Sequence, residues 1–344
     1  MGKDIRHIII LALVILLLVG CSAIGERNKN NNDSSGDNSS LAQEKVLSID
    51  PDPRPEEETI TLYFKHRYSD YLVPEVRTAV RNKQSWEQLI VEESLKGPSQ
   101  HDRVAIMPPG VRVLDVTSKD DTVFVNLSQE FTEDINLTSI PGKEDIPEDM
   151  KDEVQAEMKL LGIYSIVNSL TELEGVEQVR FLVENRAISY TDLDDDLASL
   201  FFPELEALDD AQSINPMMVA LSRDKSYILT PSRSVETVFK SLLGEPNWDT
   251  VYSLLSKETA SQIQVSSKEE LASLWSALVA GIELDDNFIL DEEIKSDGRA
   301  FVTVSYTVNF TSGKKEKKHR DTIVVVNEDN IWKVKLPRFV SDFR

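Results

Sequence analysis

Three histidines, one cysteine and many carboxylates are the side chains of this sequence that could perform catalysis. Nucleophilic catalysis needs a serine or cysteine that a nearby base activates, and His66, His101 and His319 are the only histidines after the first twenty residues. They are far apart, in predicted loops and at a predicted strand end. The sequence lacks Gly-x-Ser-x-Gly, His-Glu-x-x-His and phosphate-loop motifs. Carboxylate pairs could still hydrolyse a substrate in a chain with 60 acidic residues, but the pattern favours a protein that is no enzyme and needs no cofactor.

An aspartate cluster at residues 192–196 is the segment that comes nearest to a metal site. Carboxylates at alternating positions can surround a calcium ion, and an EF-hand loop has glycine at its sixth position and a bidentate glutamate at its twelfth. In a loop that starts at Asp192 these positions hold Leu197 and Pro203. We therefore expect no metal here and interpret residues 191–231 as an acidic connector.

A basic cluster between residues 314 and 320 contrasts with the otherwise acidic chain. It lies at a predicted hairpin tip, where it could hold an anionic partner such as a wall polymer or an acidic protein surface. The same charges could instead keep a strand edge solvated and prevent aggregation. Both interpretations stay open. The residues concerned are Lys314, Lys315, Lys317, Lys318 and Arg320.

Cys21 is the only cysteine of the chain, and its surroundings suggest lipid chemistry. Two basic residues precede an apolar run at residues 8–19. As a helix this run would be about 18 Å long, which is too short for a hydrocarbon core of about 30 Å. The layout is typical of an export signal. The segment Leu18-Val19-Gly20-Cys21 resembles the bacterial lipobox, which implies signal cleavage after residue 20, lipid on Cys21 and a place on the extracytoplasmic face of the cell membrane.

The exported part is strongly acidic and begins with a polar segment. The formal net charge is -23, and removal of residues 1–20, which carry two basic residues and one acidic residue, leaves -24. Such a chain should be repelled by the phosphates of nucleic acids, which excludes them as partners. Residues 21–58 are rich in Asn, Ser, Asp, Glu and Pro and bury too little apolar surface to fold, so we expect a flexible tether.

Periodicity predicts a first α+β domain at residues 59–190. A hairpin and two amphipathic helices give the order β-α-β-β-α-β, in which both helices would cover one face of a small sheet. A Pro-containing loop is expected between the first strand and the first helix, and Ser85 is the expected N-cap of that helix. The predicted strands are residues 59–64, 111–117, 123–127 and 178–184, and the predicted helices are residues 86–96 and 149–173.

Six segments of this domain occur in an order that carries a family resemblance. They are Thr61-Leu62-Tyr63-Phe64, Leu72-Val73-Pro74-Glu75, Ser94-Leu95-Lys96-Gly97-Pro98, Ile106-Met107-Pro108-Pro109-Gly110, Val125-Asn126-Leu127-Ser128-Gln129-Glu130-Phe131 and Ile166-Val167-Asn168-Ser169-Leu170-Thr171. Together they resemble the GerMN domain of sporulation and spore-germination lipoproteins, although many members have Pro-Ala-Gly where this chain has Pro108-Pro109-Gly110. The resemblance implies a non-enzymatic module and does not name its partner.

A second α+β domain is predicted at residues 232–344, with helices packed on a curved antiparallel sheet. Ser234, Asn247 and Ser267 are the expected N-caps of its three helices. The layout is similar to the NTF2-like family, whose cone-shaped domains can enclose a ligand pocket. Trp248, Trp275 and Trp332 could line such a pocket or fill the core. The predicted strands are residues 288–295, 300–310, 317–326 and 331–336.

These features predict a membrane-anchored lipoprotein that works as an interaction or scaffold module in sporulation or spore germination. Its expected partners are the membrane, through lipid on Cys21, and an envelope or spore-membrane protein. The first alternative is a lipoprotein that binds a small molecule or wall fragment in the C-terminal cone. The second alternative is a wall hydrolase. The oligomeric state stays open.

Overall fold

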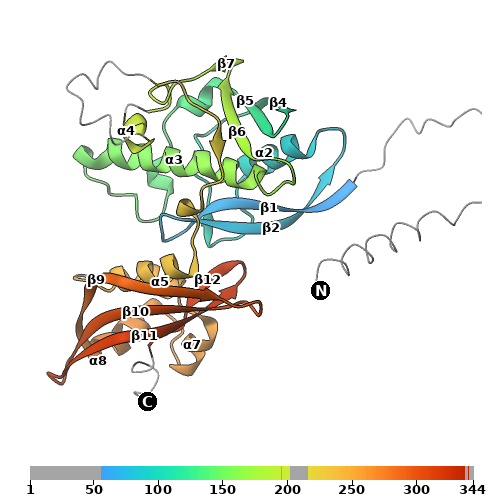
Figure 1. The fold of residues 1–344 in the computed structure, drawn as a ribbon. Coiled ribbons are helices and arrows are strands. Elements are labelled where there is room, and N and C mark those ends of the chain that lie inside the picture. The colour runs from blue at the N-terminus through green and yellow to red at the C-terminus, as the bar shows by residue number, and fades with distance from the viewer. Residues whose placement is uncertain (1–55, 195, 202–215, 338–339, 341–344) are drawn as a thin grey trace, which may run out of the picture. The chain divides into compact units, whose positions relative to one another are not determined.

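The structure, a computed structural model, describes residues 56–194, 196–201, 216–337 and 340 (Figure 1). All described residues belong to one compact unit, which begins at Asp52. The predicted signal peptide, the lipobox and Cys21 lie outside the described residues, as does the predicted tether before residue 56.

A long hairpin forms the first sheet. β1 (Glu56–His66) pairs antiparallel with β2 (Leu72–Arg81), and β3 (Arg103–Val104) pairs with the end of β1, so the strand order is β2-β1-β3. We predicted a Pro-containing loop in place of β2. The prediction was wrong because β2 is an edge strand. The backbone nitrogen of Pro74 faces away from β1, so the ladder between β1 and β2 needs no N–H at this position.

A second sheet has the order β4-β5-β6-β7, and β8 also pairs with β6. β5 and β6 are parallel, with α3 in the connection between them. Because β1 belongs to the other sheet, the first domain has two sheets and not the single small sheet that we predicted. The bounds are β4 (Val113–Lys119), β5 (Thr122–Leu127), β6 (Gln178–Val183), β7 (Arg186–Ala187) and β8 (Leu221–Ser222), with 3-10 turns η1 (Gln129–Thr132), η2 (Leu137–Ser139) and η3 (Glu148–Met150).

Two helices complete the first core. α2 (Trp86–Lys96) starts at the predicted cap, because the Ser85 hydroxyl accepts a hydrogen bond from the backbone N–H of Gln88 (3.1 Å). It ends at Gly97, whose φ of +85° favours glycine. α3 (Lys151–Leu170) is buried along most of its length, so nearly all of its faces contact protein and few face solvent.

α3 makes two close contacts with other parts of the first core. The hydroxyl of Ser169 accepts the backbone N–H of Tyr63 at 2.9 Å and so satisfies the edge of β1 that faces away from β2. Gly162 allows a closer approach, since a Cβ placed there would lie 2.6 Å from the backbone oxygen of Ile106. The Ile106 segment, part of the family resemblance, therefore packs directly on the helix backbone.

Residues of the predicted connector take part in the first core. α4 (Leu197–Phe201) and η6 (Lys225–Tyr227) are ordered elements of this region, and the ring of Phe201 lies 4.5 Å from that of Tyr190. Leu193, Leu197, Ala198, Met218 and Leu221 are buried in the first core cluster. The first core therefore extends beyond residue 190 as far as β8.

The second domain is a four-stranded antiparallel sheet of order β12-β11-β10-β9 with helices packed on it, which confirms the predicted α+β class (Figure 1). Register shifts along β10 accompany the curvature of this sheet. The bounds are α5 (Pro231–Lys240), α6 (Trp248–Ser253), α7 (Lys257–Gln262), α8 (Lys268–Leu278), β9 (Val279–Ile294), β10 (Arg299–Phe310), β11 (Lys315–Glu328) and β12 (Ile331–Val334).

Two of the three N-caps that we predicted for this domain are confirmed. Asn247 caps α6 and Ser267 caps α8, each through its side-chain oxygen. The cap of α5 is Thr230, whereas the predicted cap, Ser234, is a buried residue of the helix. Thr230 is favoured because Pro231 follows it, and proline is well placed in the first turn of a helix.

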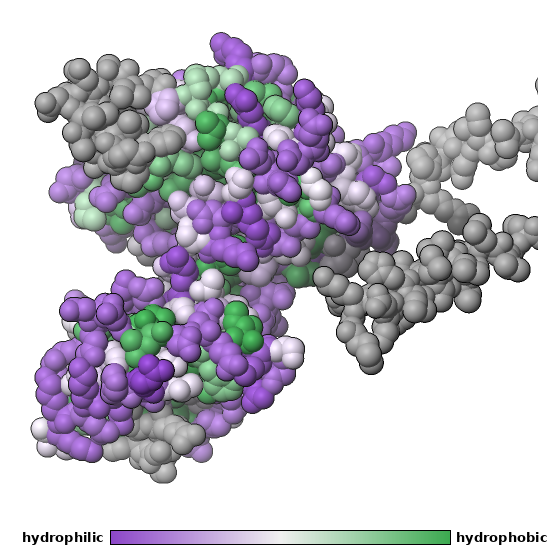
Figure 2. All heavy atoms as spheres, in the orientation of Figure 1, coloured by the Kyte–Doolittle hydropathy of each residue, from purple (hydrophilic) through white to green (hydrophobic). Residues whose placement is uncertain are grey.

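Hydrogen bonds join the first-domain residues around β1 and β2 to the second domain. The Thr250 hydroxyl donates to the backbone oxygen of Tyr68 (2.7 Å), and Arg233 donates to the Tyr71 hydroxyl (3.0 Å). Val73 of β2 is buried in the second core. The surface in view is mostly hydrophilic, as the charge of the chain leads one to expect (Figure 2).

Candidate ligand pocket

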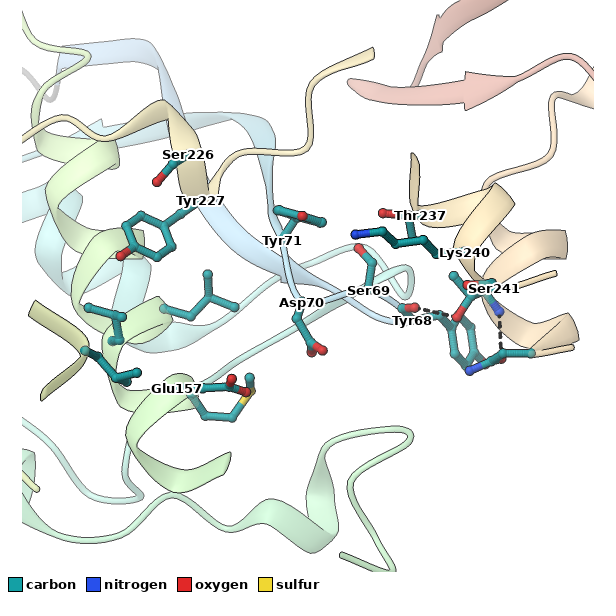
Figure 3. Close-up of a pocket in the computed structure, with 16 residues that line it drawn as sticks. Tyr68, Ser69, Asp70, Tyr71, Glu157, Ser226, Tyr227, Thr237, Lys240 and Ser241 are labelled. Atoms are coloured by element: carbon teal, nitrogen blue, oxygen red, sulfur yellow. Dashed lines mark hydrogen bonds between the residues drawn. The ribbon is translucent and has the colours of Figure 1, made fainter. Parts of the chain in front are cut away.

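A pocket of about 730 Å³ lies where α3, the β1–β2 turn, η6, α5 and α6 meet (Figure 3). Its lining combines three tyrosines, an apolar wall from α3 and two carboxylates. The residues used below are Tyr68, Ser69, Asp70, Glu157, Tyr227 and Lys240. A volume of this size is in the range of small-molecule sites.

A buried lysine holds the turn that forms one wall. Lys65 is 1% exposed, and its Nζ donates to the backbone oxygens of His66 (3.1 Å) and Ser69 (3.0 Å). Asp70 lies 3.4 Å from this ammonium and 3.1 Å from that of Lys143. Burial alone would raise the pKa of Asp70, but the two lysines outweigh it and hold the pKa below its ordinary value. Asp70 is therefore an ionised structural carboxylate.

His66 and Ser69 form the nearest approach to a nucleophile–base pair at the pocket. The Nδ1 of His66 lies 3.0 Å from the Ser69 hydroxyl. Burial, together with the charges of Lys333, Lys65 and Arg103, lowers the pKa of His66 well below 6.5, so the ring is neutral at pH 7. Within the described part of the chain its Nε2 has no hydrogen-bond partner. Among the described residues no third group orients this base, and the pair is the side-chain contact of a tight turn.

A second pair of the same kind lies in the second domain. The hydroxyl of Ser305 is 3.0 Å from Nδ1 of His319, on adjacent strands of the sheet. Ser305 is only 3% exposed and also accepts the backbone N–H of Arg320, whose φ of +54° marks a bulge. The serine is therefore engaged in the sheet and is not presented to a substrate.

Glu157 is the pocket carboxylate that is open to a ligand. It projects from α3 toward the same space as Asp70 (Figure 3). Within the described residues its carboxylate makes no ion pair. Partial burial raises its pKa, with Lys143 opposing the effect and Asp70 adding to it. An amino group of a ligand would relieve this unpaired charge.

Tyr227 forms the aromatic part of the wall. Its ring is stacked on Tyr164 at 4.3 Å, which fixes its orientation. Leu161 and Met158 of α3 continue the apolar surface. The pocket therefore suits a small molecule with an amino group and an apolar portion.

Acidic neighbours accompany four of the five residues of the predicted basic cluster. Lys315 pairs with Glu283 (2.8 Å) and Lys317 with Asp285 (3.0 Å) on β9, while Glu316 lies between Lys314 (3.0 Å) and Lys318 (2.5 Å). Arg320 lies at the bulge described above. These residues are apart from the pocket, and their contact with an anionic partner stays a prediction.

The other predicted site residues have structural surroundings. Trp275 is 5% exposed, and Trp248 and Trp332 pack against the second core. Trp248 also lines a separate hollow of about 280 Å³. Asp192 accepts the backbone N–H of Ser189 (2.7 Å). The described residues contain no group of three or more His, Cys, Asp or Glu side chains that could hold a metal ion.

The helices in the described part of the chain are too short or too polar to cross a membrane.

A family model described as "Germane: Sporulation and spore germination" matches residues 61–189, less than half of the chain. It confirms the predicted resemblance of the first domain. The NTF2-like resemblance of the second domain stays a prediction. No curated protein matches the chain.

Solved structures that are similar to part of the chain include two of one sporulation protein. The tandem GerMN domains of the sporulation protein GerM from Bacillus subtilis share 19% identity over 39% of this chain and 40% of that chain, with a TM-score of 0.27. This chain therefore spans less than half of that tandem protein. The first GerMN domain of the same protein shares 15% identity over 38% of this chain and 84% of that chain, with a TM-score of 0.25.

Proposed function

We propose that this protein is an extracytoplasmic lipoprotein, held on the cell membrane through lipid on Cys21, that acts as a non-enzymatic interaction module in sporulation or spore germination. The match of residues 61–189 to a family described by those two processes carries the proposal. The apolar run at residues 8–19 and the lipobox ending at Cys21 support export and lipid attachment.

The use of ionisable groups in the first core fits an interaction role. Lys159 is 6% exposed and donates to Asp134 (3.0 Å) and to the backbone oxygen of Leu193 (2.6 Å). Glu75 accepts the backbone N–H and hydroxyl of Ser99. These buried groups tie loops to the core and give the domain a fixed surface, which is what a docking module needs.

Complementation of a strain that lacks the gene tests the proposal in the organism that carries it. The intact chain should restore heat-resistant spores and germination. Cys21→Ser should take up no fatty-acid analogue and lose membrane attachment, because acyl transfer needs the thiol. A chain without residues 56–230 that keeps the tether and Cys21 should stay on the membrane and lose function.

The matched control changes two exposed histidines, His101→Gln and His319→Gln, which should leave function intact. His66 is excluded from this control because it is buried and hydrogen-bonded. Loss of function in the folded, correctly located double variant would contradict a non-enzymatic role. Full function of the deletion chain would show that the first domain is not the working part.

A second candidate function, ligand binding, is favoured by the pocket beside Glu157. We predicted a pocket inside the C-terminal cone, whereas this pocket lies beside α5 and α6, against α3. Cadaverine is a suitable probe, since it joins amino groups to an apolar chain. Its binding, measured by calorimetry, should be lost in Glu157→Gln and kept in Glu153→Gln, an exposed control on the same helix. Equal binding by both variants would exclude this site.

A further inference from the structure

The outer edge of β2 is unpaired along most of its length in the described part of the chain. β2 pairs with β1 on one side, and on the other side only Leu72 forms an isolated bridge, with Ile228. The backbone N–H of His66 donates to Tyr71 (2.8 Å) across the hairpin, which sets the phase of the ladder: odd-numbered residues of β2 face β1 and even-numbered residues face away. The backbone oxygens of Leu72 and Pro74, which accept Leu229 and Arg103, agree with this phase.

Beyond Pro74 the edge is open at three successive outward positions. Val76, Thr78 and Val80 receive no backbone hydrogen bond from another described segment. Their side chains share one face, on which Val76 is 43% and Val80 is 44% exposed and Thr78 is also exposed. Proteins commonly protect such edges with a lysine, a proline or a bulge, and the register of β1 with β2 has no shift. These three positions have none of those protections.

We propose that β2 pairs antiparallel with β2 of a second copy of this chain, with Thr78 on the twofold axis. In this register Val76 faces Val80 of the second copy, and Thr78 faces Thr78. The six outward N–H and C=O groups of one copy meet their complements on the other, as a closed twofold interface requires. The two three-stranded sheets would become one six-stranded sheet.

Charge selects this register over its neighbours. Centred on Thr78, Arg77 faces Ala79 and Arg81 faces Glu75, so no like charges stand opposite each other. A shift that centres the pair on Arg77 places two copies of that arginine together, and a shift to Ala79 places Arg77 opposite Arg81. Like charges directly opposite each other destabilise a strand pair. The occupant that this edge fits is therefore the same edge of a second copy.

Disulfide cross-linking in the membranes of cells that make the full chain tests the contact. Opposed Cα atoms in a hydrogen-bonded pair are about 5.5 Å apart, within reach of a disulfide. Thr78→Cys should therefore give a linked dimer under oxidation. Thr59→Cys is the matched control: it is exposed and faces Thr78 within the hairpin, but two copies of it would be about 14 Å apart. We expect at least roughly tenfold more dimer from Thr78→Cys.

Two further variants test the register. Val76→Cys and Val80→Cys should each link poorly alone, because two copies of one position would lie about 14 Å apart. A mixture of the two chains should link well. Adding Thr78→Pro to both chains should reduce that linkage, because it removes an outward N–H while leaving the ladder with β1 intact, as Pro74 already does. The wild-type chain, with Cys21 alone, sets the background.

Three outcomes would overturn the proposal. Dimer yield from Thr78→Cys no greater than from Thr59→Cys would show that the edges do not meet. Efficient linkage of Val76→Cys or Val80→Cys alone would show a different register. Linkage of Thr78→Cys to a protein of another mass, without the homodimer, would show that the edge belongs to a different partner. The test does not depend on the proposed function, because the cross-link is read without spores or germination.

Discussion

Arg103 should be among the residues that matter most to stability, because it joins β3 to both the hairpin and the second domain. Its side chain is fully buried. One terminal nitrogen donates to Gln100 (2.5 Å) and Asp102 (2.5 Å), and the other donates to the backbone oxygens of Pro74 (2.7 Å) and Asp329 (2.8 Å). Arg103→Met keeps an apolar side chain about as long as the arginine stem and removes every donor. The variant therefore isolates the hydrogen bonds from the packing of the stem.

The expected loss follows from the groups that are left without a donor. Asp102 is 37% exposed at its side chain and can return to water. The carbonyls of Pro74 and Asp329 are partly buried, and each should cost about 1–2 kcal/mol when unpaired. The substitution also removes the desolvation cost of the buried guanidinium charge, which offsets part of this loss. We expect the free energy of unfolding to fall by about 2–4 kcal/mol in total, which lowers Tm by at least about 4 °C.

Urea and thermal unfolding of the exported part, with Arg112→Met as the control, measure this loss. Arg112 has a 69% exposed side chain and a single 3.7 Å contact with Glu130, so its loss should cost under about 1 kcal/mol. Equal effects of the two substitutions would refute the reasoning. It would mean that the four hydrogen bonds of Arg103 contribute no net stability beyond the cost of burying its charge.

Three further predictions follow from single contacts. Gly162→Ala gains about 1 kcal/mol of helix propensity but places a Cβ 2.6 Å from the backbone oxygen of Ile106. The free energy of unfolding, measured in urea, should therefore fall by about 1–2 kcal/mol. A more stable variant would contradict this prediction. Burial alone would raise the pKa of Glu75, but the hydrogen bonds from Ser99 and the ion pair with Arg77 outweigh burial and hold the pKa below 4.5. The ionised carboxylate therefore stabilises the fold above pH 4.5. This stabilisation is lost as the pH falls through the lowered pKa. Glu75→Gln should therefore be less stable than the parent at pH 7 and should approach it at pH 3, and an equal gap at both would count against it. A fragment of residues 56–230 should unfold more cooperatively by circular dichroism than one of residues 56–190, which lacks β8 and the buried Met218 and Leu221; similar melts would show that these residues add nothing.

The elements that the sequence predicted well are those whose signal is local. α2 combines an apolar stripe with a serine cap and a glycine stop, and the structure places it at Trp86–Lys96 as predicted. β2 was missed because Pro74 argues against a strand unless the strand is known to lie at an edge, which only the pairing of distant residues decides. α7 was missed because its sequence, Lys257–Gln262, has almost no apolar stripe. It forms because the Ser256 hydroxyl accepts the N–H of Thr259 and caps it.

The pocket could not be predicted because no local pattern marks it. Its residues come from the turn after β1, from the middle of α3 and from α5 and α6, and each segment has an ordinary local explanation. Tyr68 is a turn residue, Glu157 is one acidic residue among 60, and Lys240 pairs with Glu236 one helical turn away. Only the packing of the two cores brings them to one space. A site that several elements form together leaves no periodic signal in any of them.

Basic residues show most clearly where local reasoning fails. The sequence directed attention to the dense cluster at residues 314–320, because density is what a linear pattern reveals. Four of its members pair with acidic neighbours that are exposed or half-buried at the surface, and ion pairs of this kind contribute little to stability. Isolated basic residues have the larger structural effect: Lys65 and Arg103 are buried and donate to backbone oxygens that would otherwise lack partners. With 60 acidic and 37 basic residues, two copies of the chain repel each other electrostatically. Self-association must therefore use a patch without net repulsion, and the uncharged edge of β2 at Val76, Thr78 and Val80 meets that condition.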